Sequence, residues 1–156
     1  MNSTSNKTIP RFMTPIVETH CHLDYLDPES LRATLDAAAD YGIERIVTIA
    51  VSPDNLETVR NLAAQNQQVW CTQGIHPHEA SAWNQDVAEK VIAGCDEART
   101  VAVGEIGLDY HYDHSNRTAQ ARALDEQLHI AAQQNLPVVI HTRDADDDTR
   151  AILSNH

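Results

Sequence analysis

The chain has 156 residues, of which 42% are hydrophobic and 22% charged, so it can bury the core of one globular domain and is not a disordered polymer. Acidic residues outnumber basic ones 23 to 11, and the formal net charge of −12 argues against a basic groove that tracks along nucleic acid. The sequence has no apolar run long enough for a signal peptide or a membrane span, and its three cysteines form no CxxC pair. We therefore expect a cytoplasmic protein with reduced thiols and no membrane partner.

The N-terminal residues 1–15 are polar, contain Pro10 and Pro15, and are predicted to form a disordered tail. From Ile16 onward the chain alternates β-branched runs with helical patterns, which is typical of parallel βα units, so residues 16–156 are predicted to form one domain. The expected strands cover residues 16–20, 43–50, 69–73, 101–103 and 138–141. The expected helices cover residues 27–42, a segment that begins at the Ser52-Pro53 cap, and residues 86–98, 117–134 and 144–153.

The fourth predicted helix, residues 117–134, carries the apolar positions that should face the sheet. We expect it to bury Leu124, Leu128, Ala131 and Ala132.

Five strand-then-helix units of about thirty residues each indicate part of a TIM-type (β/α)8 barrel, whose eight units normally need about 250 residues. The α/β alternative is a doubly wound sheet, which would bind a nucleotide where the strand order reverses. No strand is followed by GxGxxG, so the barrel is favoured. The sequence then predicts a barrel truncated after its fifth strand.

Histidines and one glutamate gather where the predicted strands end. In a parallel barrel the carboxyl ends of all strands face the same rim, so side chains distant in sequence should meet there. Three imidazoles and one carboxylate would give a mixed nitrogen and oxygen shell for divalent metal, and the carboxylate could bridge two ions. The members of this shell are His20, His22, Glu105 and His141.

Each of these residues also has an ordinary interpretation when taken alone. An isolated HxH is more often incidental than ligating, Glu105 could be a carboxylate at the start of a helix, and His141 could be a hydrogen-bonded rim residue. The metal site is favoured because the same coincidence would have to occur on three separate strands.

Four ordered segments resemble the TatD family of metal-dependent deoxyribonucleases. They are His20-Cys21-His22-Leu23-Asp24, Gly74-Ile75-His76-Pro77-His78, Val103-Gly104-Glu105-Ile106-Gly107-Leu108-Asp109-Tyr110, and the segment from Leu136 to Ala145 that contains Val139-Ile140-His141-Thr142-Arg143. The resemblance covers residues 16–153 and implies an amidohydrolase-type barrel, two divalent ions per complete site, and hydrolysis of DNA phosphodiester bonds.

The resemblance also implies roles for individual residues. His20 and His22 would bind the first metal, Glu105 would bridge and serve as the catalytic carboxylate, and His141 would bind the second metal. The family also uses a histidine on the sixth strand and an aspartate on the eighth, and neither has a counterpart among these 156 residues.

Four further residues are candidates for substrate binding. His76 and His78 could line the substrate pocket or cap their loop. Arg143 could make a two-pronged contact with a phosphate or simply pair with Asp144. Tyr110 could hydrogen-bond substrate or pack.

The favoured hypothesis is a divalent-metal-dependent deoxyribonuclease of the TatD type that uses a metal-activated water, with 3′–5′ exonuclease action as one form of it. Its substrate would be a DNA end or a short single strand, and its metals would be Mg²⁺, Mn²⁺ or Zn²⁺. One alternative is a metal-dependent hydrolase of another ester or amide. The other is a catalytically inactive fragment of the barrel that self-associates through its unpaired edge strands.

Overall fold

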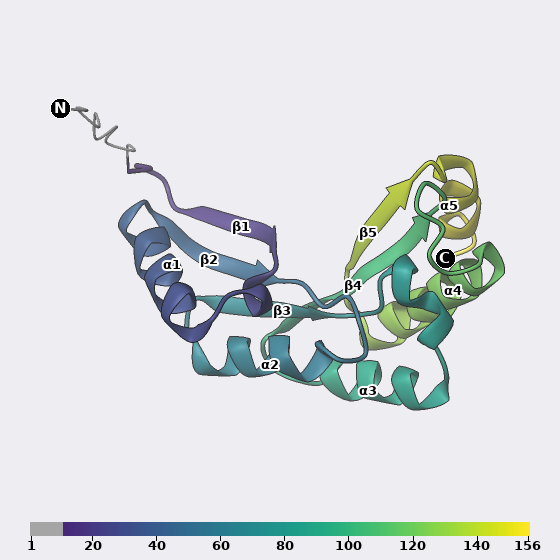
Figure 1. Ribbon diagram of the computed structural model, residues 1–156, viewed down its shortest axis with the longest axis horizontal. Coiled ribbons are helices and arrows are strands. Elements are labelled where there is room, and N and C mark those ends of the chain that lie inside the picture. The colour runs from purple at the N-terminus through teal and green to yellow at the C-terminus, as the bar shows by residue number, and fades with distance from the viewer. Residues whose placement is uncertain (1–10) are drawn as a thin grey trace.

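The computed structural model describes residues 11–156, which form five parallel strands in the order β1-β2-β3-β4-β5. The strands curl into a half-barrel whose concave face is open, with β1 and β5 at its two edges (Figure 1). The strands are β1 (Ile16–Cys21), β2 (Ile43–Thr48), β3 (Val69–Gln73), β4 (Thr100–Asp109) and β5 (Val138–Arg143). This architecture confirms the predicted partial TIM-type barrel.

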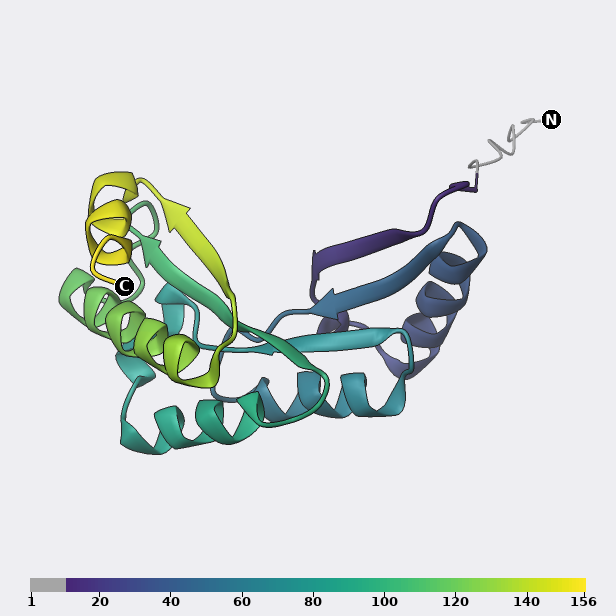
Figure 2. The ribbon, with the colours of Figure 1, turned by 180° about the vertical axis from the view of Figure 1, so that it is seen from behind.

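The helices lie on the outer, convex face of the curled sheet, as the view from behind also shows (Figure 2). The α-helices are α1 (Pro28–Asp40), α2 (Leu56–Gln65), α3 (Gln85–Cys95), α4 (Arg117–Gln134) and α5 (Asp146–Leu153). Two short 3₁₀ helices, η1 (Leu23–Tyr25) and η2 (Pro77–Ala82), follow β1 and β3. None of the helices within residues 11–156 has the length and apolarity needed to cross a membrane.

The predicted disordered tail, residues 1–15, falls largely outside the described residues, which begin at residue 11. Residues 11–15 are exposed and have no regular secondary structure. The backbone N–H of Phe12 nevertheless donates to the carbonyl of Tyr41 at 2.9 Å, which ties this segment to the end of α1.

Helix α1 begins where its sequence predicts, because Asp27 caps it with a side-chain oxygen that accepts from the N–H groups of Glu29 and Ser30. Helix α2 begins later than the Ser52-Pro53 cap predicts, at Leu56. The reason is a turn in which the Asn55 side-chain oxygen accepts from the backbone N–H groups of Val51 and Ser52, at 3.0 and 3.1 Å. The chain therefore folds once more before it becomes helical.

The face that α4 turns to the sheet differs from the predicted one. Leu124, Leu128 and Ala131 are buried as expected, but Ala132 is exposed, so the prediction for Ala132 was wrong. Two glutamines, Gln120 and Gln127, are fully buried on the same face instead. They lie seven residues apart, which places them on one side of the helix.

These two glutamines bind the backbone where two neighbouring strands end. Gln127 accepts from the N–H of Ile75 at 2.7 Å and donates to the Ile75 carbonyl at 3.2 Å. Gln120 does the same for Asp109, accepting at 2.8 Å and donating at 3.1 Å. Each glutamine thus replaces the sheet partner that these backbone groups lack, and α4 fixes the ends of β3 and β4 relative to each other.

Strand β4 also runs very close to β5. Gly107 pairs with His141 in the sheet, and a Cβ at position 107 would collide with the His141 backbone. Gly107 has a φ of 152°, which side chains rarely tolerate. The glycine therefore lets the backbone that carries His141 approach the strand that carries Glu105.

We predict that Gln127→Leu lowers the free energy of unfolding by roughly 1–3 kcal/mol, because it leaves the Ile75 N–H buried without a partner. Denaturant unfolding would measure this change. The control is Gln133→Leu, an exposed glutamine on the same helix. Equal destabilisation by both substitutions would contradict the role of Gln127.

Candidate metal centre

The candidate centre lies where the carboxyl ends of β1, β3, β4 and β5 meet. His20 belongs to β1, His76 follows β3, Glu105 lies within β4, and His141 lies within β5. The structure brings the ligating atoms of His20, His22 and Glu105 within 4.8 Å of one another, and does the same for His76, Glu105 and His141. Glu105 is common to both groups, so it is the centre of the arrangement.

The two carboxylate oxygens of Glu105 face different histidines. Oε2 lies 3.4 Å from His20 Nε2, and Oε1 lies 3.2 Å from His141 Nδ1. The Glu105 residue is nearly buried, with 9% of its surface exposed, whereas 40% of the His20 side chain is exposed. One carboxylate is therefore placed between two imidazole groups from opposite edges of the half-barrel.

His22 completes the group on the β1 side. Its ring lies 5.5 Å from that of His20 and is stacked on the ring of Tyr25 at 5.3 Å. Its Nδ1 atom is buried and finds no hydrogen-bond partner among residues 11–156. The imidazole is thus held by stacking, and no hydrogen bond competes for this nitrogen.

His141 lies between two carboxylates. Its Nε2 is 3.1 Å from Asp109 Oδ2 and its Nδ1 is 3.2 Å from Glu105 Oε1, and a carboxylate can only accept. A metal ion bound through Nδ1 would leave the proton on Nε2, where it would donate to Asp109 while that carboxylate orients the ring.

Asp109 is a central residue of this region that the sequence patterns did not single out. Its side chain is completely buried and accepts four hydrogen bonds, from the rings of His78 and His141 and from the backbone N–H groups of His111 and Tyr112. Burial alone would raise the pKa of Asp109, but these hydrogen bonds outweigh it and hold the pKa below its usual range. Asp109 is therefore an ionised carboxylate that fixes two histidines.

One sequence signal could have indicated this role. Asp109 is the last residue of a long apolar strand whose carboxyl end forms the rim, and a carboxylate in that position needs partners.

To bind a metal ion through Nε2, the neutral His76 ring would need its proton on Nδ1. The structure favours the other tautomer of His76. Its Nδ1 accepts the backbone N–H of His78 at 3.1 Å, so in the neutral ring Nε2 carries the proton. Burial lowers the pKa of His76 to about 3, with further contributions from the neighbouring His141 and His78. His76 is thus a neutral side chain whose Nε2–H can donate a hydrogen bond to another group at the rim.

The remaining sequence candidates have different surroundings. His78 donates to Asp109 at 2.8 Å, so it helps to hold the Asp109 carboxylate in place. The Arg143 guanidinium lies over the Tyr112 ring, 4.7 Å from its centre, and the carboxylate of Asp144 contacts His111 instead of Arg143. Arg143 therefore does not form the ion pair with Asp144 that would have given it a purely structural role.

Tyr110 points away from the centre, toward α5. Its hydroxyl donates to Asp148 at 2.7 Å, and the Arg117 guanidinium covers its ring at 4.1 Å. Burial, and then the hydrogen bond and charge of Asp148, raise the pKa of Tyr110 to about 12. These contacts join the segment that follows β4 to α5.

The donor set fits divalent metal ions. Neutral imidazole and carboxylate donors suit Zn²⁺ and Mn²⁺, and the buried Nδ1 of His22 has no hydrogen-bond partner among the described residues. His20, His22 and Glu105 would hold one ion, and Glu105 and His141 would provide donors to a second.

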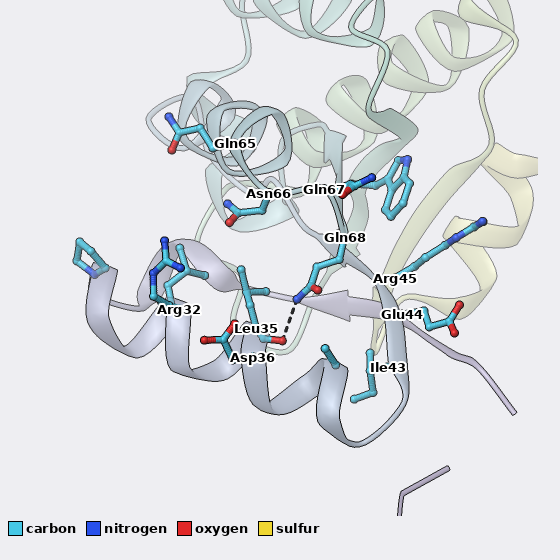
Figure 3. A pocket seen from close by; sticks show the side chains of 14 residues that line it. Arg32, Leu35, Asp36, Ile43, Glu44, Arg45, Gln65, Asn66, Gln67 and Gln68 are labelled. Carbon is cyan, nitrogen blue, oxygen red and sulfur yellow. Dashed lines mark hydrogen bonds between the residues drawn. The ribbon is translucent and has the colours of Figure 1, made fainter. Parts of the chain in front are cut away.

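A hollow of about 860 Å³ lies away from these residues, between α1 and residues 65–68 (Figure 3). The Gln68 side chain donates to the Leu35 carbonyl beside it, at 2.9 Å. This hollow is lined by residues 43–45, at the amino end of β2, so it opens on the rim opposite the histidines. Function in parallel barrels resides at the carboxyl ends of strands, which argues against this hollow as the active site.

Comparison with known proteins places these features in a family. The chain matches the family described as TatD related DNase over residues 17–156. It is 38% identical over 112 residues to the 3′-5′ ssDNA/RNA exonuclease TatD of Cronobacter sakazakii, covering 72% of this chain and 43% of that protein. It is 33% identical over 143 residues to the uncharacterized metal-dependent hydrolase YcfH of Escherichia coli K12, covering 88% of this chain and 53% of that protein.

The fold is similar to that of a solved relative. The crystal structure of YJJV, a TatD homolog from Escherichia coli K12, matches with a TM-score of 0.83 and 34% identity, over 90% of this chain and 56% of that one. The chain spans about half the length of the curated relatives it matches. From the family match over residues 17–156 and this structural likeness, we conclude that the chain belongs to the TatD related DNase family.

Proposed function

We propose that this chain carries metal ligands of a phosphodiesterase that removes nucleotides from the 3′ end of single-stranded nucleic acid. The observation that carries the proposal is the position of Glu105, with one oxygen toward His20 and the other toward His141. A carboxylate between two imidazole groups is the arrangement that a pair of divalent ions needs. The names of the relatives, a 3′-5′ exonuclease and a metal-dependent hydrolase, support the same chemistry.

In this proposal the chain's own residues have distinct tasks. His20, His22, Glu105 and His141 hold the ions, which would supply Lewis acidity and an activated water when bound. Asp109, the partner of His141 Nε2, would orient the ring so that Nδ1 faces Glu105 and the ions. The Nε2–H of His76 would donate to a non-bridging phosphate oxygen, on which negative charge grows as the attacking water oxygen adds to phosphorus.

The charge of the protein favours a chain end as substrate. With 23 acidic and 11 basic residues, the protein repels an extended phosphate backbone, and binding would depend on the metal ions and the rim. Arg143 is the cation beside His141 that could contact a phosphate next to the cleaved bond. A protein of this charge would take one or a few nucleotides at a time.

We predict that Glu105→Ala abolishes divalent-stimulated release of nucleotides from a single-stranded oligonucleotide and weakens Mn²⁺ binding measured by calorimetry. The control is Glu57→Gln, an exposed carboxylate on α2. Retained nucleotide release in Glu105→Ala would contradict the proposal. Turnover of carboxyl esters by the wild type, with no release from oligonucleotides, would instead support a different hydrolase.

We predict that Asp109→Asn weakens metal binding by about 10- to 100-fold, because the amide disrupts the hydrogen bonds that orient His141. Calorimetric titration with Mn²⁺ would measure this without relying on catalysis. Asp113→Asn, an exposed aspartate four residues further on, is the control. Unchanged metal affinity in Asp109→Asn would show that His141 needs no such support.

We predict that His76→Asn lowers kcat on the order of 10²-fold without changing the thermal midpoint. Asparagine can still accept the His78 N–H that caps η2, but it has no group at the position of Nε2–H. The measurement is kcat for nucleotide release beside a melting curve. A kcat close to that of the wild type would rule out donation by His76.

A further inference from the structure

A second hollow adjoins the candidate metal centre on the side of β1. Its volume is about 440 Å³, within the range of roughly 300–1,000 Å³ typical of small-molecule sites. One wall comes from η1, with Asp24 and Tyr25, and the other from the segment that contains Ser52 and Asn55. His22 and Glu105 lie where this pocket meets the metal centre.

Tyr25 gives this pocket an exposed aromatic wall. The residue is 73% exposed, although large aromatic side chains are usually covered. One face of its ring is stacked on His22, with centres 5.3 Å apart and planes 17° apart. The ring is therefore held flat in one orientation beside the metal centre, with most of its surface available to a planar ligand.

The polar groups of the pocket can bind the hydroxyl and amino groups of a nucleoside. Its lining contains the carboxylates of Asp24, Glu79 and Glu105 and the imidazoles of His22, His76 and His78, with neither lysine nor arginine. Asp24 Oδ2 accepts from the Asn55 side chain at 3.0 Å, while Asp24 Oδ1 is buried and has no partner among the described residues. A free carboxylate oxygen can accept from a sugar hydroxyl or an amino group of a base.

Hydrogen bonds hold the walls of the pocket in place. Asn55 uses its side-chain oxygen to hold the backbone N–H groups of Val51 and Ser52 while its amide donates to Asp24. On the other side, the Leu23 N–H donates to the Thr48 hydroxyl at 3.2 Å. Both walls are thus fixed by hydrogen bonds before a ligand arrives, which limits the entropy lost on binding.

From these features we propose that the pocket binds the nucleoside at the 3′ end of the strand, with its base stacked on Tyr25 and its sugar or base donating to Asp24. The proposal rests on the function proposed above, because the phosphate of that nucleotide would lie at the Glu105 centre. It assigns selection of the terminal nucleotide to aromatic stacking on Tyr25. Stacking on an aromatic ring accepts every base and would give little sequence preference.

The test compares two single-stranded tetranucleotides with phosphorothioate linkages, which resist hydrolysis, in the presence of Mn²⁺. One ends in a normal 3′ nucleotide, and the other has an abasic residue at that end. We expect the abasic strand to bind wild type about 5- to 100-fold more weakly, which is the range that loss of one base–aromatic stack gives. In Tyr25→Ala this ratio should fall close to one, and in Tyr25→Phe it should be retained.

The control is Tyr112→Ala, which removes another exposed tyrosine from the same rim and should leave the ratio unchanged. A wild-type ratio of one, or an unchanged ratio in Tyr25→Ala, would overturn the assignment of the pocket. Nucleotide release by a wild type whose ratio is one would leave the proposed function standing and reject only this inference. Absence of both binding and nucleotide release in the wild type would reject both.

Discussion

The carboxylate of Asp109 is the contact on which the geometry of this region depends. A buried charge is tolerated only when hydrogen bonds satisfy it, and Asp109 accepts from two imidazole rings and two backbone N–H groups. These donors come from β5, from the segment after β3 and from the loop after β4, so the one carboxylate holds three parts of the rim together. As a result, His141 is oriented toward Glu105. Glu105 in turn connects the β5 side of the proposed metal centre with its β1 side.

Asp109 is itself positioned from outside the sheet. Gln120 binds both its N–H and its carbonyl, and Gln127 binds those of Ile75, the residue before His76. The backbone that carries the histidines at the rim is thus positioned by hydrogen bonds from helix α4 to Ile75 and Asp109. Buried, fully paired amides fix position more sharply than apolar packing, because a displaced side chain loses directional bonds at both ends.

Much of the fold could be predicted from sequence because its signals are periodic. Alternating strands and helices indicate the barrel, and the rule that parallel strands end at one rim brings His20, Glu105 and His141 together. The boundaries of α4 and β3 agree with the predicted residues 117–134 and 69–73. The start of α2 was missed because the turn that delays it depends on the contacts of a single asparagine side chain.

The rest of the region could not be predicted, because it depends on which atoms meet. A helical pattern assigns glutamine to the solvent side and alanine to the core. The buried Gln120 and the exposed Ala132 lie on the opposite sides from those that this rule predicts. The tautomer of His76 is decided by a backbone N–H and the orientation of His141 by two carboxylates, and periodicity reveals neither contact. The same holds for Asp24 and Tyr25, whose significance lies in a pocket formed by distant segments.

The spacing of Gln120 and Gln127 along α4 matches the spacing of the two strand ends that they bind at the rim. Seven residues are close to two helical turns, and one inserted or deleted residue between them would turn one glutamine by about 100° around the helix axis. That glutamine would then face solvent, and one strand end would lose its anchor. The number of residues in α4 between Gln120 and Gln127 is therefore set by the distance between the two strand ends that these glutamines bind.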